Sequence, residues 1–216
     1  MSANGTRTVF VLTNTPKLYG EDLNKHGRLP MFIDNIGSLL AQLKNVSMAG
    51  LVLEVDKVMK ATREERDRLF RYASTFPVMR SRANTKNGFV TYLDPRDAFF
   101  ANLTTALGQR ERNHVRKTVV MRCLFAREND PSMAAAEEGT ILDISPGGCY
   151  VQAPATLADE HFLHLRIQDM ANSRPICSSI RWTRATENDT ATTGMGLMFI
   201  DPEGDQIKEI EALPTA

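Results

Sequence analysis

The sequence predicts a two-domain α+β protein in which a small N-terminal α/β domain precedes a six-stranded antiparallel β-barrel with a short terminal helix. In the first half, short apolar runs alternate with segments whose apolar residues recur at helical spacing. This alternation is typical of a mostly parallel sheet covered by helices. In the second half, six short strand-like runs follow one another with turn residues between them, as in an antiparallel barrel or sandwich.

Bulk properties agree with a soluble globular protein. The chain has 216 residues, of which 42% are hydrophobic and 24% are charged, so it has room for one large or two small domains. The net charge is zero, but residues 1–108 carry +5 and residues 109–216 carry −5, as two domains of different surface character would. We therefore predict an α/β domain over 1–107, a linker over 108–117 and a barrel over 118–216.

Each element of the first half has a local sequence signal. Pro30 suits the first turn of a helix that continues to Leu43, and the polar segment 20–28 before it is expected to be a loop. Thr62 and Glu65 form a capping box that opens a charged helix. Asp94-Pro95 begins the last helix of this half. The runs expected as strands are 8–12, 50–55, 77–80 and 89–93.

The second half changes to the period of β-strands. Alternation of apolar and polar residues begins at Val119, and turn residues such as Asn, Asp, Gly and Pro separate the runs. Asp201-Pro202 leads into a short terminal helix. The runs expected as barrel strands are 119–125, 140–143, 149–152, 162–167, 176–184 and 194–200.

Signatures of catalysis and metal binding are missing from the sequence. The first half contains neither G-x-G-x-x-G nor G-x-x-x-x-G-K-[ST], the loops that bring backbone close to phosphate groups. Its histidine at position 26 has no second histidine or cysteine at ligand spacing. Asp56, at the end of a predicted strand, is interpreted as a solvated carboxylate. We therefore expect a protein that is not an enzyme and that has no metal site or cofactor.

Residues 63–71, R-E-E-R-D-R-L-F-R, form the densest charge run of the chain. Because arginines alternate with carboxylates, we favour a solvated helix face over a nucleic-acid site. A docking surface for a partner protein is the alternative. Neither half is basic enough for a dedicated DNA-binding domain.

Cysteine usage and the N-terminal segment favour the cytoplasm. The three cysteines are widely spaced and odd in number, which fits a reducing compartment better than a disulfide framework. The N-terminus lacks a basic segment followed by an apolar one, and no apolar run approaches the roughly 20 residues of a membrane span. We expect a cytoplasmic protein without membrane insertion.

Two short motifs flank the first predicted barrel strand. Arg112 and Arg116 form R-x-x-x-R in the linker, and D-I-S-P-G-G matches [DN]-x-S-x-x-G through Asp143, Ser145 and Gly148. A bare arginine pair carries little information in an arginine-rich chain, but the second motif is much rarer by chance. Both motifs in this order, around a barrel strand, are much less likely to occur by chance.

With these motifs, residues 109–205 resemble the PilZ domain, a bacterial receptor module for cyclic di-GMP. The later strands, I-R-W-T-R and G-M-G-L-M-F-I, are similar to the closing strands of that family. The resemblance implies that Arg112, Arg116, Asp143, Ser145 and Gly148 bind the nucleotide. The first half does not resemble the β-rich partner domain of flagellar-brake PilZ proteins.

The chemistry of these residues suits such a ligand. A guanidinium binds a phosphate or the O6/N7 edge of guanine through paired hydrogen bonds, and the carboxylate of Asp143 can accept from N1–H and N2–H of guanine. Ser145 would share a face of the strand with Asp143, and Gly148 allows a close approach. His114 and Gly147 are possible secondary contacts.

For each residue a structural role is also open. The arginines can be ordinary linker charges, and Asp143 and Ser145 can cap a turn. His114 is expected to be solvated, and Gly147 to be a turn residue in either case. Trp182 is expected to pack in or over the barrel rather than to stack on a base.

The predicted function is that of a cyclic di-GMP receptor that signals to a protein partner in motility, pilus or exopolysaccharide control. Ligand binding would order the linker and reorient the N-terminal domain. Two alternatives remain: a PilZ-type adaptor that binds protein but no nucleotide, or a regulatory barrel attached to a catalytic N-terminal domain. A homodimer is possible, and the number of nucleotides bound per chain, one or two, is left open by the sequence.

Overall fold

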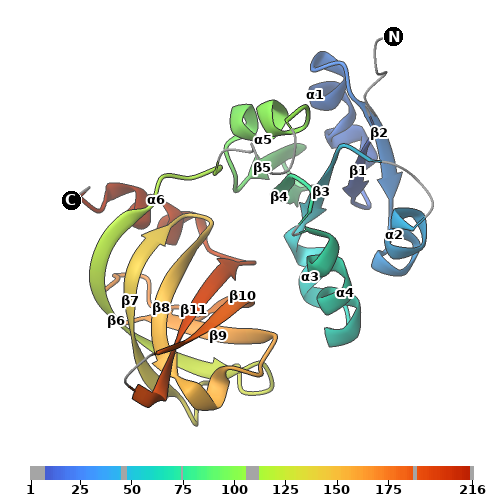
Figure 1. Ribbon diagram of the computed structural model, residues 1–216. Helices are drawn as coiled ribbons and strands as arrows, with labels where there is room; N and C mark the ends of the chain where they lie inside the picture. Colours follow the sequence, from blue (N-terminus) through green and yellow to red (C-terminus); the bar gives the residue numbers. More distant parts are fainter. Residues whose placement is uncertain (1–7, 45–47, 74, 106–111, 187–188, 215–216) are drawn as a thin grey trace. The chain divides into compact units, whose positions relative to one another are not determined.

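The computed structural model describes residues 8–44, 48–73, 75–105, 112–186 and 189–214. Within it, the chain divides into two compact units, Met1–Asn113 and His114–Ala216. Figure 1 shows the elements of both units, each of which is described by itself. Residues 108–111 of the predicted linker lie outside the described residues.

The first unit contains a five-stranded sheet in the order β2-β1-β3-β4-β5. Four strands run parallel, and β5 alone pairs antiparallel with β4. The predicted α/β fold with a mostly parallel sheet is therefore confirmed. The strands are β1 (Thr8–Leu12), β2 (Leu29–Ile33), β3 (Gly50–Glu54), β4 (Val78–Asn84) and β5 (Phe89–Tyr92).

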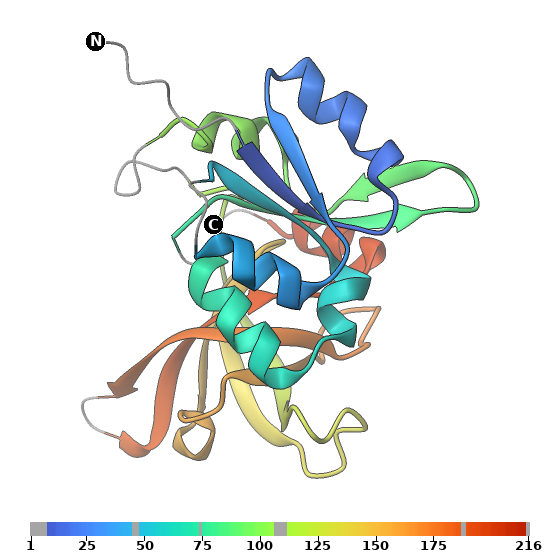
Figure 2. The same ribbon diagram turned by 90° about the vertical axis from the view of Figure 1, so that its right-hand side faces the viewer.

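Helices cover both faces of this sheet. Val9 and Val11 pack in one core cluster with Tyr19 and Phe99, so the alternate residues of β1 point to the opposite face. There α2 and α4 lie side by side (Figure 2). No helix within the described ranges is long and apolar enough to cross a membrane. The helices are η1 (Pro16–Leu18), α1 (Gly20–Lys25), α2 (Ile36–Leu43), α3 (Val55–Lys60), α4 (Arg63–Ala73) and α5 (Arg96–Asn102).

The helix expected to begin at Pro30 is the main difference from the sequence-based prediction. Pro30 lies in β2, and the helix begins only at Ile36, where Asn35 Oδ1 accepts a hydrogen bond from Ser38 N at 2.8 Å. β2 is an edge strand, where a proline without N–H is tolerated. The segment expected to be a loop at 20–28 contains α1.

The capping box at the start of α4 is confirmed. Thr62 N donates to Glu65 Oε2 at 3.0 Å, and Glu65 N donates to Thr62 Oγ1 at 3.2 Å. Together these bonds satisfy two backbone donors at the helix start. Glu65 is therefore committed to the helix terminus.

The second unit is a closed six-stranded antiparallel barrel in the order β10-β11-β8-β7-β6-β9, followed by helix α6 (Gly204–Ala212). This part of the predicted fold is also confirmed (Figure 1). The barrel strands are β6 (Lys117–Arg127), β7 (Glu137–Ser145), β8 (Gly148–Pro154), β9 (Phe162–Ile167), β10 (Ile176–Thr186) and β11 (Asp189–Phe199), with a short η3 (Ala155–Leu157).

The barrel interior is apolar and includes two of the three cysteines. Cys123 and Cys149 belong to the core cluster, together with Phe125, Ile144 and Phe199 among others. Burial raises the pKa of Cys123 to about 12. A thiol in this state is protonated at neutral pH and is a poor nucleophile.

Candidate functional site

The D-I-S-P-G-G motif occupies the end of β7 and the turn that follows. β7 continues through Ser145, so only Pro146 and Gly147 separate it from β8. A register shift between Ile141 and Asp143 turns Ile144 into the barrel core, where it is fully buried. The neighbours of Ile144 in the strand, Asp143 and Ser145, therefore lie on the opposite face.

Arg116 and Asp143 form an ion pair outside the barrel core. Arg116 Nη1 donates to both carboxylate oxygens of Asp143, at 2.8 and 3.1 Å. Pairing of Thr118 with Asp143 brings the segment before β6 next to β7. The side chains of Arg116 and Asp143 are 31% and 27% exposed, so a ligand can reach both.

These two contacts leave binding capacity on both sides of the pair. They use one nitrogen of the guanidinium, which carries five N–H donors over three nitrogens, and each carboxylate oxygen can accept more than one hydrogen bond. A ligand with an anionic group and an N–H edge can therefore bind across the pair without first breaking it.

Ser145 closes the β7–β8 turn. Its side chain is nearly buried, and Oγ donates to the carbonyl oxygen of Gly148 at 3.2 Å. This is the turn-capping role considered as an alternative for Ser145. Asp143, two residues earlier, takes no part in that turn contact and is paired with Arg116 instead.

Gly148 is required by close packing of β8 against β11. A Cβ atom at this position would lie 2.0 Å from the carbonyl oxygen of Leu197. This distance is shorter than any non-bonded contact, and the obstructing atom belongs to the backbone, so it cannot rotate away. The absence of a side chain at Gly148 thus allows the motif to pack against β11.

His114 lies against the turn. A Cβ atom on Gly147 would be 2.9 Å from Cδ2 of the His114 ring, so the imidazole packs directly over the backbone of Gly147. The structure therefore brings the possible secondary residues His114 and Gly147 together, next to the D-x-S-x-x-G motif. The half-buried position of His114 differs from the solvated one expected for it.

Arg112 is not placed at this site by the structure. It is exposed and lies in the first compact unit, which ends at Asn113, whereas Arg116 belongs to the second. The R-x-x-x-R motif thus spans the division between the units. That Arg112 contributes to the site stays a prediction.

An aromatic pair extends the site along the barrel. Residues on four neighbouring strands are paired in a row: Asp143 with Tyr150, Tyr150 with Gly196, and Gly196 with Trp182. The rings of Tyr150 and Trp182 are stacked, with centroids 5.4 Å apart and planes at 23°. Trp182 is 46% exposed, so it lies over the barrel, one of the two positions expected for it.

Glycines in β11 make room for these rings. A Cβ on Gly196 would lie 2.3 Å from Nε1 of Trp182, and one on Gly194 would lie 2.6 Å from the hydroxyl of Tyr150. Aromatic side chains commonly cover glycines on an adjacent strand. Tyr150 was not singled out from the sequence. The G-M-G pattern opposite two aromatic-containing strands is the signal that would have found it.

Replacing Gly148 by Ala tests this packing. We expect the free energy of unfolding of the barrel to fall by about 1–3 kcal/mol, because the added methyl group forces β8 away from β11. Chemical denaturation followed by the fluorescence of Trp182 measures the change. Gly204→Ala is the matched control, since a Cβ there meets no atom within 4 Å. Equal stability of the two variants would contradict the steric role of Gly148.

No group of three or more His, Cys, Asp or Glu side chains in the described part of the chain is arranged to hold a metal ion. Two grooves of the surface, with volumes of ≈ 610 and ≈ 580 Å³, are lined by residues of the first unit. The candidate site combines partly exposed charged side chains with an aromatic pair.

A family model described as the PilZ domain matches residues 110–214. Solved structures similar to this chain include the inhibitor of motility MotI/DgrA of Bacillus subtilis (19% identity, TM-score 0.37, 47% of this chain and 48% of that chain). A second is PlzA of Borreliella burgdorferi in complex with c-di-GMP (11% identity, TM-score 0.34, 44% of this chain and 48% of that chain). A third is the PilZ domain of YcgR from Escherichia coli with c-di-GMP (14% identity, TM-score 0.33, 47% of this chain and 86% of that chain).

The matched region spans about half the length of MotI/DgrA and of PlzA. The family model does not extend into residues 1–109. The comparison with curated proteins found no match.

Proposed function

Residues 110–214 form a PilZ domain, and from this premise we propose that the chain is a bacterial cyclic di-GMP receptor that signals to a protein partner. The observation that carries the proposal is the Arg116–Asp143 ion pair, which is accessible and lies in the same cross-strand row as Tyr150 and Trp182. It combines a cation, a carboxylate and an aromatic surface.

Each of these groups matches one part of the ligand. The guanidinium of Arg116 suits a phosphate or the O6/N7 edge of guanine. The carboxylate of Asp143 is an acceptor for the N1–H and N2–H donors of guanine. The exposed face of Trp182 offers a surface on which a base can stack, which is worth about 1–3 kcal/mol per base in other proteins.

Ser145, Gly147 and Gly148 support the site through the backbone. The contact from Ser145 Oγ to Gly148 O fixes the turn, and the absence of side chains at the two glycines lets the ring of His114 and the carbonyl of Leu197 pack against the backbone. His114, packed over Gly147, is proposed as a secondary contact. In this arrangement Asp143 binds the ligand, whereas Ser145 holds the turn that positions it.

For signalling, we propose that Arg112 joins Arg116 on the ligand. Because R-x-x-x-R spans the division between the two units, binding by both arginines would restrict the junction and reorient residues 1–107. Such a change requires that the ligand bind one arrangement more tightly than the other. The role proposed for the receptor is non-enzymatic and cytoplasmic, in motility, pilus or exopolysaccharide control.

Titration of the full chain with cyclic di-GMP tests the proposal. We expect a Kd in the nanomolar-to-micromolar range by calorimetry. The fluorescence of Trp182, the only tryptophan, should change with the same midpoint, because a base stacked on the indole alters its surroundings. Lack of both heat and fluorescence change at high micromolar ligand would favour the adaptor that binds no nucleotide.

Cyclic di-AMP is the matched control ligand. It retains both phosphates, but adenine lacks the N1–H and 2-amino donors that Asp143 is proposed to accept. We expect cyclic di-AMP to bind at least about 100-fold more weakly than cyclic di-GMP. Without these donors, the carboxylate of Asp143 would lose water on binding and gain no hydrogen bond in exchange. Equal affinity for the two dinucleotides would contradict the role of Asp143.

A further inference from the structure

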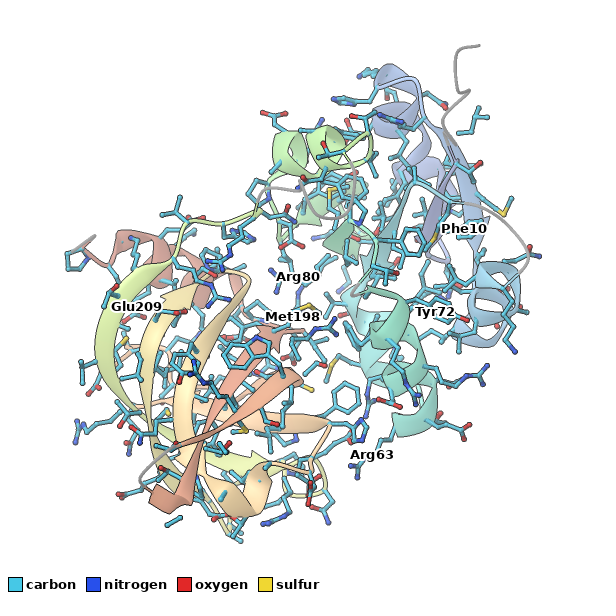
Figure 3. The ribbon with its side chains drawn as sticks, in the orientation of Figure 1. Phe10, Arg63, Tyr72, Arg80, Met198 and Glu209 are labelled. Atoms are coloured by element: carbon cyan, nitrogen blue, oxygen red, sulfur yellow. The ribbon has the colours of Figure 1, made fainter. Side chains whose placement is uncertain are left out.

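A groove in the first unit lies between the end of α2 and the C-terminal half of α4. Its volume is ≈ 610 Å³. α2 and α4 are in contact along this side of the sheet (Figure 2), and Tyr72 and Arg63 mark the two ends of α4 in Figure 3. The groove is lined by Leu43, Lys44, Arg68, Arg71, Tyr72, Thr75 and Phe76.

The apolar part of the groove consists of Leu43, Tyr72 and Phe76. All three are only partly buried, although side chains of this size stabilise the fold most when they are fully covered. Aromatic residues that line a concave surface are the usual anchor points of protein interfaces. The three side chains therefore provide an apolar floor for an incoming anchor residue.

The remaining side chains give the groove a basic rim. Arg71 is paired with Asp67 on the same helix, and Glu65 is engaged by the capping box at Thr62. Lys44 and Arg68 form no ion pair with any carboxylate in the described parts of the chain. Two cations beside the apolar floor are thus left for an external carboxylate.

The pattern on α4 suits recognition of an extended or helical segment. Arg68, Arg71 and Tyr72 are spaced i, i+3 and i+4, which places them on one face of the helix. Leu43 and Lys44, at the end of α2, form the opposite wall. A helix that docks in a groove commonly alternates apolar anchors and charges with this spacing.

We propose that this α2–α4 groove is a docking surface for an acidic amphipathic segment of a partner protein. Complementary charge argues for the occupant: unpaired cations attract carboxylates, while Leu43, Tyr72 and Phe76 accept an apolar side chain. Two cations beside an apolar floor do not suit nucleic acid, whose affinity depends on neutralising many phosphates. The charged stretch 63–71 then has a function besides solvation.

This proposal does not depend on nucleotide binding. The groove residues belong to the first unit, whereas Arg116 and Asp143 belong to the second. If cyclic di-GMP does not bind, the proposal for the groove still stands. If the peptide does not bind, the proposal for the nucleotide site still stands. The two proposals are therefore examined by separate titrations.

The test uses the full chain and a synthetic peptide of about 15 residues, enough for roughly four helical turns. The peptide carries Leu or Phe at i, i+3, i+4 and i+7 and Glu at most other positions, with a fluorescent label for anisotropy. One control peptide has Lys in place of Glu, and a second has Ser in place of the apolar anchors. We expect the acidic anchored peptide to bind at least about tenfold more tightly than either control.

Charge reversal in the protein locates the binding. Lys44→Glu/Arg68→Glu should weaken the acidic peptide at least about tenfold and strengthen the Lys peptide, because the sign of the rim is inverted. Lys17→Glu/Lys86→Glu changes the net charge equally at exposed positions outside the groove. We expect this control to bind within about twofold of the unmodified chain. Circular dichroism verifies that all variants are folded.

Three results would overturn the proposal. The first is equal loss of peptide binding in the groove variant and in the control variant, which would indicate general charge attraction. The second is binding of a single-stranded oligonucleotide that exceeds peptide binding and is lost in the groove variant. The third is a dimer of the unmodified chain that dissociates in the groove variant, which would make a second copy the occupant.

Discussion

Replacing Asp94 by Asn is expected to lower the free energy of unfolding of the first unit by about 3–5 kcal/mol. Asp94 and Arg80 form an ion pair in which the two side chains are 6% and 5% exposed. Arg80 Nη2 donates to Oδ1 at 2.6 Å, and its Nε and backbone N donate to Oδ2 at 3.0 and 2.7 Å. Asn keeps the shape of the side chain but removes the negative charge that faces the buried guanidinium.

Urea denaturation followed by far-ultraviolet circular dichroism measures this loss, because α1 to α5 all belong to the first unit. Glu21→Gln is the matched control, since it removes an equally charged partner from the exposed Glu21–Lys25 pair and should leave the midpoint unchanged. Arg80→Met/Asp94→Leu removes both charges and should recover much of the loss. An unchanged midpoint for Asp94→Asn would show that the pair is dispensable.

Replacing Arg112 and Arg116 together by Ala is expected to weaken cyclic di-GMP binding by about 10³-fold. Each substitution removes charge-assisted hydrogen bonds worth about 2 kcal/mol, and every 1.4 kcal/mol corresponds to a tenfold change in Kd. Calorimetry on the full chain measures the effect. Arg122→Ala is the matched control, because Arg122 is an exposed arginine of β6 paired with Asp169. Affinity of the double variant equal to that of the unmodified chain would rule out this site.

Asp143→Ala separates the ion pair from its proposed role with guanine. The substitution should weaken the ligand while the fold is kept, because Asp143 is partly exposed. Since Asp143 and Arg116 are in contact, their single effects should not add, and the double variant should cost less than the sum. Additive effects in this cycle would mean that the two residues bind the ligand independently.

The overall fold was predictable because it depends on hydrophobic periodicity. Alternation in β6 and the short apolar run of β1 are local patterns, and each determines which face of a strand is buried. Pro30 shows the limit of this reasoning. A proline at this position is compatible both with the first turn of a helix and with an edge strand. The segment is a strand because Leu29–Ile33 pairs with β1.

The two motifs of the candidate site were found in the sequence, but the aromatic pair beside them was not. Asp143, Ser145 and Gly148 are close in sequence, so their mutual arrangement follows from one strand and one turn. Tyr150 and Trp182 are 32 positions apart in the printed sequence, and they stack only because β8, β11 and β10 are adjacent with a particular register. Register over three strands is a property of the closed barrel.

The sequence by itself determined the class of both domains and the position of the two motifs. These properties depend on residue type and on spacing within a few positions. The tertiary structure alone decided that Arg116 pairs with Asp143, that His114 packs on Gly147 and that Arg80 is buried with Asp94. Such contacts join residues far apart in the chain, and their geometry depends on how strands and helices pack around each core.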